Sequence, residues 1–151
     1  GDFNRLDMIY KYQMVEITNV VDKASSEIKR EAGKHYVGSI GLNLSRDTRD
    51  NWIFPTRGYK LVLSPEMAGL GGDTKFMKLT GSGSIYLPLL FKNVLHLGAK
   101  GGIMDRYGST KRVPIFDRFF LGGADTIRGF DYRDISPRDE FNESIGGNTM
   151  G

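Results

Sequence analysis

Apolar and polar residues alternate with a period of two along five stretches of the chain. Successive side chains of a β-strand point to opposite faces of a sheet, so each stretch predicts a strand with one apolar and one polar face. In the longest stretch, Met77, Leu79 and Ile85 alternate with Lys78 and Ser84. The five predicted strands span residues 6–17, 36–46, 59–67, 75–89 and 94–106.

The connections between these strands are alternately short and long. Residues 47–58 and 90–93 predict compact turns, because Pro55, Gly58 and Asn93 favour turn conformations. The longer connections span residues 18–35, 68–74 and 107–143. Strands of about 10 residues joined in this alternating way are typical of an outer-membrane β-barrel.

The first long connection also carries a helical signal. Its middle part, VDKASSEIKREA at residues 21–32, predicts a short helix capped by Asn19 or Asp22. Such an excursion between two strands is compatible with a loop outside the sheet.

A soluble meander or sandwich with one face on a core would also show alternation. Three features favour the barrel. The apolar faces carry tyrosines near strand ends, such as Tyr10, Tyr36 and Tyr59, which suits an aromatic girdle at a membrane interface. The opposite faces are rich in Gly, Ser, Lys and Asn, and the longer connections all fall on one side. The sequence therefore predicts an all-β, antiparallel up-and-down meander that is part of a transmembrane β-barrel.

Composition excludes several other classes of protein. The net charge of +3 arises from 21 basic and 18 acidic residues scattered along the chain, so there is no concentrated basic surface for nucleic acid. No apolar run is long enough for a transmembrane helix. The absence of cysteine fits either a reducing or an exported location, and therefore does not locate the protein. The excess of glycine, at 20 positions, calls for positions of close approach or unusual backbone geometry.

Three short motifs carry a family resemblance. The segment FDRFFLGGADTIRGF at residues 116–130, followed by SIGGNTMG at 144–151, resembles the long lumen-entering loop of BamA-type outer-membrane assembly factors and the strand that follows it. The segment RDTRDNWIFPTRGY at residues 46–59 resembles a periplasmic turn of that family. The resemblance implies a partial barrel domain over residues 1–151, with five strands, a loop at 107–143 and a sixth strand starting within 144–151.

The resemblance also implies a function. A BamA-type factor folds and inserts β-barrel proteins into the outer membrane of a Gram-negative bacterium without bond chemistry, so it implies no enzyme, no cofactor and no metal. The expected partners are outer-membrane lipid, unfolded β-barrel clients and accessory assembly lipoproteins, with no nucleic acid. Three alternatives stay open: a two-partner secretion translocase of the same family, a passive pore or autotransporter barrel, and a soluble β-domain.

The most informative part of the loop is a four-residue motif around one cation. The guanidinium of Arg128 can bind a carboxylate through two hydrogen bonds, and Gly129 permits a close approach of the backbone. Ile127 and Phe130 can pack around such a pair and exclude water. We therefore expect Arg128 to fix the loop to the inner wall of the barrel.

By the resemblance, the acidic partners of Arg128 lie on strands after Gly151. In this chain Arg128 is then solvated, disordered, or paired with a local acid, for which Asp125, Asp131 and Asp134 are the candidates. Two further sets of site residues follow from the motifs. They are Arg118, Phe119, Gly122 and Gly123 at the loop base, and Asp47, Arg49, Pro55 and Gly58 in the periplasmic turn.

The excised sheet would have unpaired edges and an apolar face without lipid. We therefore expect the isolated chain to bury these surfaces by self-association or by folding its sheet onto itself.

Overall fold

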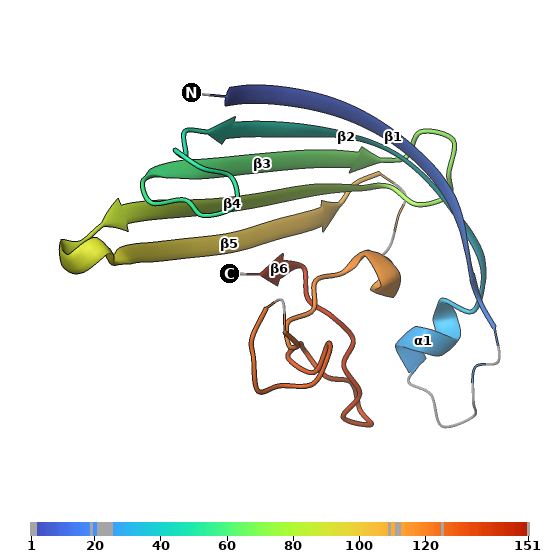
Figure 1. Cartoon of the computed structure of the whole chain (residues 1–151). Helices are drawn as coiled ribbons and strands as arrows, with labels where there is room; N and C mark the ends of the chain where they lie inside the picture. Colours follow the sequence, from blue (N-terminus) through green and yellow to red (C-terminus); the bar gives the residue numbers. More distant parts are fainter. Residues whose placement is uncertain are drawn as a thin grey trace.

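The computed structural model describes residues 3–18, 20, 26–108, 110, 113–124 and 126–150. These residues form one antiparallel sheet in which the strand order follows the chain order, from β1 to β6 (Figure 1). The strands are β1 (Phe3–Ile17), β2 (Gly33–Asp47), β3 (Gly58–Ala68), β4 (Phe76–Pro88), β5 (Val94–Arg106) and β6 (Thr149–Met150). The predicted all-β, up-and-down meander is confirmed.

The strand bounds differ most from the expectation at the last strand. The strand expected to start within residues 144–151 comprises only Thr149 and Met150, which pair with Ile103 and Gly102 of β5. The preceding residues bridge to the loop instead, since Gly147 pairs with Phe119 and Ser144 with Arg138. Residues 144–148 therefore belong to the loop.

Short helical segments occupy three of the connections. They are α1 (Ser26–Arg30), η1 (Leu90–Lys92) and η2 (Ile115–Asp117). The helix α1 lies inside the predicted helical stretch, whereas the proposed capping residues Asn19 and Asp22 lie outside the described residues. In the β4–β5 turn, Phe91 and Lys92 both take a φ of 60°, the left-handed region that closes this tight connection.

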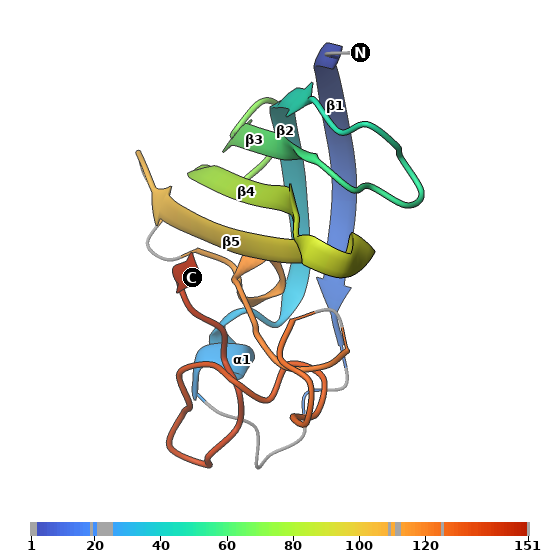
Figure 2. The same cartoon turned by 60° about the vertical axis from the view of Figure 1, so that its left-hand side comes forward.

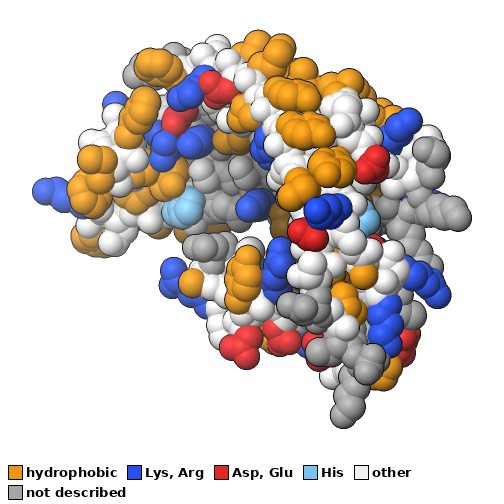
Figure 3. Space-filling view, turned by 90° about the vertical axis from the view of Figure 1, so that its right-hand side faces the viewer, with side chains coloured by type: hydrophobic (Ala, Val, Ile, Leu, Met, Phe, Trp, Pro, Cys, Tyr) orange, Lys and Arg blue, Asp and Glu red, His pale blue; other side chains and the backbone are white. Residues whose placement is uncertain are grey.

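The sheet is curved, and its two faces differ in character. Cross-strand pairs such as Leu6 with Leu44 and Leu44 with Leu63 place apolar side chains side by side on the convex face. Leu6 and Met8 expose 64% and 70% of their surface there. Figure 3 shows hydrophobic side chains gathered over the upper part of the molecule, where the sheet lies. The convex face is thus apolar and uncovered within the described chain.

The concave face is partly covered by the segment between β5 and β6. Residues 107–148, called here the wall loop, fold back beneath the sheet (Figures 1 and 2). The buried core lies between the two and is small. It comprises Val37, Ala68, Phe76 and Met104 from the sheet and Val113 and Phe119 from the wall loop.

One close contact between the wall loop and the sheet is made at a glycine. The ring of Phe119 lies over Gly102 of β5, where an added Cβ atom would come within 2.6 Å of the ring carbon Cζ. Phe119 is 8% exposed. The ring of Phe119 can therefore pack directly against β5 because residue 102 has no side chain.

Gly102→Ala should displace Phe119 and weaken the docking of the wall loop by about 1–3 kcal/mol, because the added methyl group overpacks the contact. Gly98→Ala is the matched control on the same face of β5, since its Cβ would meet its nearest atom, His96 Nε2, at an ordinary 3.6 Å. Limited proteolysis of the wall loop in the full-length barrel measures the difference. Equal protection in both variants would contradict the proposed role of Gly102.

Candidate functional site

The two motif regions occupy separate parts of the sheet. The β2–β3 turn, residues 48–57, lies at the same end of the strands as the β4–β5 turn, whereas the wall loop leaves β5 at the opposite end (Figure 1). The wall loop then returns beneath the concave face.

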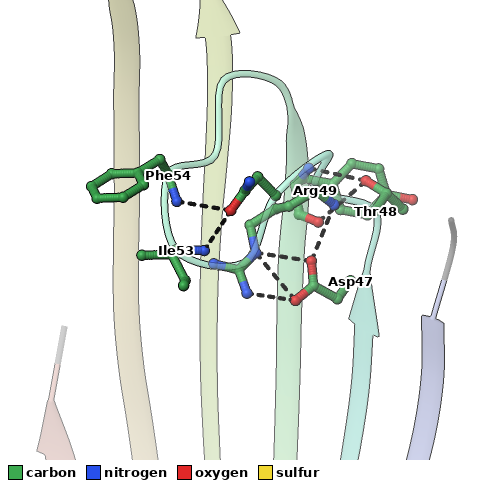
Figure 4. Close-up of polar contacts among 7 residues, drawn as sticks. Asp47, Thr48, Arg49, Ile53 and Phe54 are labelled. Carbon is green, nitrogen blue, oxygen red and sulfur yellow. Dashed lines mark hydrogen bonds and ion pairs between the residues drawn. The ribbon is translucent and has the colours of Figure 1, made fainter.

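An ion pair joins the end of β2 to the turn. Arg49 donates to both carboxylate oxygens of Asp47, from Nε to Oδ1 at 2.9 Å and from Nη2 to Oδ2 at 2.6 Å (Figure 4). The two side chains expose only 13% and 15% of their surface, and the Asp47 carboxylate raises the pKa of Arg49 above its ordinary value. The predicted turn residues Asp47 and Arg49 are therefore brought together as a two-bond pair.

Two further side chains fold the turn by accepting backbone N–H groups. Asp50 accepts from the N–H groups of Thr56 and Arg57 at 2.8 and 3.1 Å, and also from the Thr56 hydroxyl. These bonds, those from Thr56 foremost, hold the pKa of Asp50 well below its usual range. Asn51 Oδ1 accepts from the N–H groups of Ile53 and Phe54 (Figure 4). Sequence reasoning missed these two residues, although Asp and Asn commonly bond nearby backbone in this way.

Of the other two predicted turn residues, only Gly58 is required by the backbone geometry of the turn. It takes a φ of +103°, and an added Cβ would lie 2.4 Å from the carbonyl oxygen of Thr48. A side chain is therefore excluded at position 58 on two grounds. Pro55 lies half-buried within the turn.

The turn has an apolar tip that the motif comparison did not indicate. Ile53 and Phe54 are each 78% exposed, whereas the ring of Trp52 packs edge-on against Phe3 with 5.9 Å between centroids. The same Trp52 borders a cavity of about 320 Å³ that is also lined by Arg5, Asp7 and other residues of the concave face. The turn thus leans over the concave side of the sheet.

The base of the wall loop is held by backbone acceptors. Arg118 donates to the carbonyl oxygens of Val113 at 2.9 Å and Ile145 at 3.2 Å, so it joins the two ends of the loop. Phe119 exchanges both backbone hydrogen bonds with Gly147, at 2.9 and 2.8 Å. The predicted base residues Arg118 and Phe119 therefore lie together against the sheet.

A second connection to the loop base comes from the opposite part of the chain. Glu31, which follows α1, accepts the backbone N–H of Ile115 at 2.9 Å. The β1–β2 connection and the wall loop are thus linked across 84 positions in the sequence.

The two base glycines shape the start of the loop tip. Gly122 takes a φ of +107°, and its added Cβ would lie 2.3 Å from the carbonyl oxygen of Asp131. Gly123 takes a φ of +99° and donates its N–H to the carbonyl of Phe130 at 3.0 Å. This bond closes a small turn whose apex carries Ile127, Arg128 and Gly129.

Arg128 is exposed at this apex, and no hydrogen bond or ion pair joins it to the part of the chain that the structure describes. Ile127 and Phe130 are 38% and 53% exposed and do not cover it. Of the candidate local partners, Asp134 is paired with Arg138 at 2.6 Å instead.

Two candidate partners of Arg128 remain, Asp131 and Asp125. Asp131 is exposed and contributes its backbone carbonyl to the turn at Asp134, while Asp125 lies outside the described residues. Among the described residues, neither Asp131 nor Asp134 pairs with Arg128.

A row of polar side chains crosses the concave face beside the loop base, and sequence reasoning did not single it out. Ser39 donates to Glu66 Oε1 at 2.7 Å, and Lys11 Nζ lies 3.8 Å from the same oxygen. Lys78, the register partner of Glu66, donates to the carbonyl of Asp117 at 3.2 Å. The row therefore links β1, β2, β3 and β4 to the wall loop.

Asp117 is the unusual member of this region. Burial raises the pKa of its carboxyl to about 6, although the nearby charge of Lys78 acts in the opposite direction. The buried Oδ2 atom has no hydrogen-bond partner among the described residues. The wall loop therefore packs a carboxyl group against the concave face, and one oxygen of this group receives no hydrogen bond from the described residues.

The described residues contain neither a metal-binding cluster nor a transmembrane helix. The side chains of His, Asp and Glu nowhere form a group of three or more that could hold a metal ion. Among the same residues, no helix is long and apolar enough to cross a membrane.

Comparison with known proteins gives a family match and several similar proteins. Residues 2–151 match the Omp85 superfamily domain. The chain is 35% identical over 153 residues to the outer membrane protein assembly factor BamA of Nitratidesulfovibrio vulgaris, covering 99% of this chain and 19% of the relative.

Two other relatives extend the comparison. Identity is 34% over 117 residues to the BamA of Neisseria meningitidis serogroup B, covering 75% of this chain and 14% of the relative. It is 35% over 118 residues to the human sorting and assembly machinery component 50 homolog, covering 78% of this chain and 25% of the relative. The chain thus spans a quarter or less of the length of these relatives.

Arg49→Ala should destabilise the strand end by about 1–3 kcal/mol, because it leaves the largely buried carboxylate of Asp47 without its partner. Arg5→Ala is the matched control. Arg5 pairs with Asp7, also two residues away, but its side chain is 72% exposed, so we expect a loss below about 1 kcal/mol. Denaturant unfolding of the two variants in the same membrane-mimetic buffer measures the difference, and equal losses would refute the special role of the turn pair.

Docking of the wall loop should weaken as pH rises through about 6. The pKa of Asp117 is raised in the folded state from its ordinary 3.8, so the docked loop is fully stable below about pH 4 and loses stability as the carboxyl ionises. The pKa difference sets an upper bound of about 3 kcal/mol. Asp117→Asn should keep the loop protected from protease between pH 4 and 8, whereas Asp131→Asn, on the exposed part of the loop, should retain the parent's pH profile. The idea fails if the parent shows no pH dependence or if Asp117→Asn retains it.

Proposed function

The chain belongs to the Omp85 superfamily, and from this membership we propose that it is part of the barrel of an outer-membrane protein assembly factor. The observation that supports this most directly is the 35% identity to a BamA over 99% of the chain. The named relatives are assembly factors or a sorting and assembly component. These names favour assembly over the alternatives of a secretion translocase, a passive pore or an autotransporter barrel.

The proposed activity needs no bond chemistry. A client strand cannot enter lipid until its backbone N–H and C=O groups are paired, because unpaired groups cost several kcal/mol each in the bilayer. A barrel that offers an open strand edge and a disturbed bilayer lowers this barrier by pairing those groups during insertion. We therefore propose a non-enzymatic role that requires no cofactor.

The convex face fits a lipid-facing wall. Its exposed apolar side chains include Leu6, Met8, Leu61 and Leu97, each 51% exposed or more. In the full-length protein we propose that this face contacts lipid of a Gram-negative outer membrane, although the relatives come from both bacteria and eukaryotes. Self-association of the isolated chain through this face or its strand edges stays a prediction.

We assign the partners of the full-length protein by the same reasoning. They are unfolded β-barrel clients and accessory assembly lipoproteins, with the concave face as the wall of the lumen. The β2–β3 turn, with its Asp47–Arg49 pair, is proposed to lie at the periplasmic end of this wall.

For the loop tip, we propose that Arg128 binds a carboxylate on a part of the barrel outside this chain. Three observations support this role. The guanidinium is exposed at an apex whose base is already fixed to the wall by Phe119. Gly129 takes a φ of +93°, and no atom of the described residues lies within 4 Å of its added Cβ position, which leaves room for a partner. Ile127 and Phe130 flank the cation and expose apolar surface that such a partner would cover.

Arg128→Ala in the full-length protein should loosen the loop tip and cause unfolded clients to accumulate, because the tip loses its contact with the opposite wall. Arg128→Lys should give a partial defect, because an ammonium group keeps the charge but lacks the planar fork. Outer-membrane protein levels in cells and protease sensitivity of residues 123–130 measure the two effects. Normal assembly together with an unchanged digestion pattern in Arg128→Ala would rule out the proposed role.

A further inference from the structure

A cationic cavity lies between the wall loop and the concave face of the sheet. It has a volume of about 440 Å³ and is open on one side. Lys78 and Thr80 of β4 and Lys100 of β5 line it from the sheet, and Arg118 and Arg133 line it from the loop. None of its described lining residues is Asp or Glu.

Two of these cations, Lys78 and Arg133, are oriented by contacts with neutral groups. Lys78 Nζ donates to a backbone carbonyl and lies 4.8 Å from the centroid of the Phe119 ring. The guanidinium of Arg133 lies 4.4 Å from the centroid of the Phe120 ring and 5.6 Å from that of Tyr132. Carbonyls and aromatic faces orient a cation but leave its net charge available to an anion.

The described acids near the cavity are not among its lining residues: Asp134 pairs with Arg138, and Asp131 is exposed beside the lining residue Arg133. Glu66 accepts from Ser39 and lies within ion-pair distance of Lys11. Asp117 points a carboxyl oxygen into a buried position rather than into the cavity lining. Lys100 is exposed on the wall and forms no hydrogen bond or ion pair with the described part of the chain. The cavity therefore has excess positive charge on three elements, β4, β5 and the wall loop.

From this arrangement we infer that the cavity binds a peptide segment with carboxylate side chains at alternate positions. A single small ion would fill little of the volume, and cavities of this size accommodate several side chains. In an extended peptide, every second side chain points the same way at intervals of about 7 Å, so alternate Asp or Glu residues can reach cations on separate elements. The aromatic rings beside the cations provide apolar contact for the intervening residues. That the segment belongs to a client rests on the proposed function, whereas the binding itself does not.

The test uses the full-length protein in detergent and a fluorescein-labelled octapeptide of alternating Asp and Ser. Fluorescence anisotropy should show saturable binding that weakens with added salt. Lys100→Gln and Arg133→Gln should each weaken binding about fivefold, as expected for one partly exposed ion pair. Lys92→Gln removes the same charge from the distant β4–β5 turn and should bind as the parent does.

A conservative variant, a competition with phosphate and an insertion assay complete the test. Lys100→Arg keeps the charge and should retain binding. Absence of saturable binding, an equal loss in Lys92→Gln, or a loss in Lys100→Arg would overturn the site. Displacement of the peptide by inorganic phosphate at equal concentration would also overturn it, because the cavity would then select small anions. Insertion of a client barrel into vesicles is measured on the same preparations, so that peptide binding without insertion contradicts the proposed function and not the site.

Discussion

Only one of the two unlike faces of the sheet is covered by the described residues of this chain, and the rest of the structure follows from that constraint. The wall loop packs on the concave face, where Val37, Phe76 and Met104 meet Phe119. The convex face, with Leu6 and Met8 more than half exposed, has no covering element in the described chain. Burial of apolar area is worth roughly 25 cal/mol per Å², so this face is stable only against another apolar phase. In the proposed barrel, lipid around the wall supplies that phase and leaves the concave side as the place for a folded loop.

The wall loop has a base that this chain fixes and a tip that it does not. Phe119 on Gly102, Arg118 on two carbonyls and Ile115 on Glu31 hold the base. The turn that carries Arg128 is closed by its own backbone bonds. A loop that is already ordered at its base has less conformational entropy to lose when its tip is bound. Contacts within this chain therefore place the arginine, and a carboxylate elsewhere would need to supply only the final interaction.

The positions of the strands could be predicted from the sequence more completely than the contacts that the strands make with one another and with the wall loop. The alternation predicted both ends of β5 correctly, because Leu95, Leu97 and Ile103 follow the period of two without interruption. It failed at residues 144–148, where Gly146 takes a φ of +72° and Gly147 pairs with Phe119, a partner that no local pattern identifies. Asp47, Arg49 and Gly58 were found because a turn motif is local. The Ser39–Glu66–Lys11 contacts were missed because they depend on the register of strands that are far apart along the chain.

The small core also explains why an uncompensated carboxyl can persist. A soluble domain of this length buries about two thirds of its unfolded surface, and an unpaired buried polar atom then removes a sizeable part of a marginal stability. Here the described buried hydrophobic core comprises Val37, Ala68, Phe76, Met104, Val113 and Phe119. Such a core cannot be the main source of stability. The cross-strand ladder, whose breaking in lipid is very costly, carries that role instead. The energetic cost at Asp117 therefore falls on the docking of the wall loop, to which Asp117 belongs, and not on the pairing of the strands.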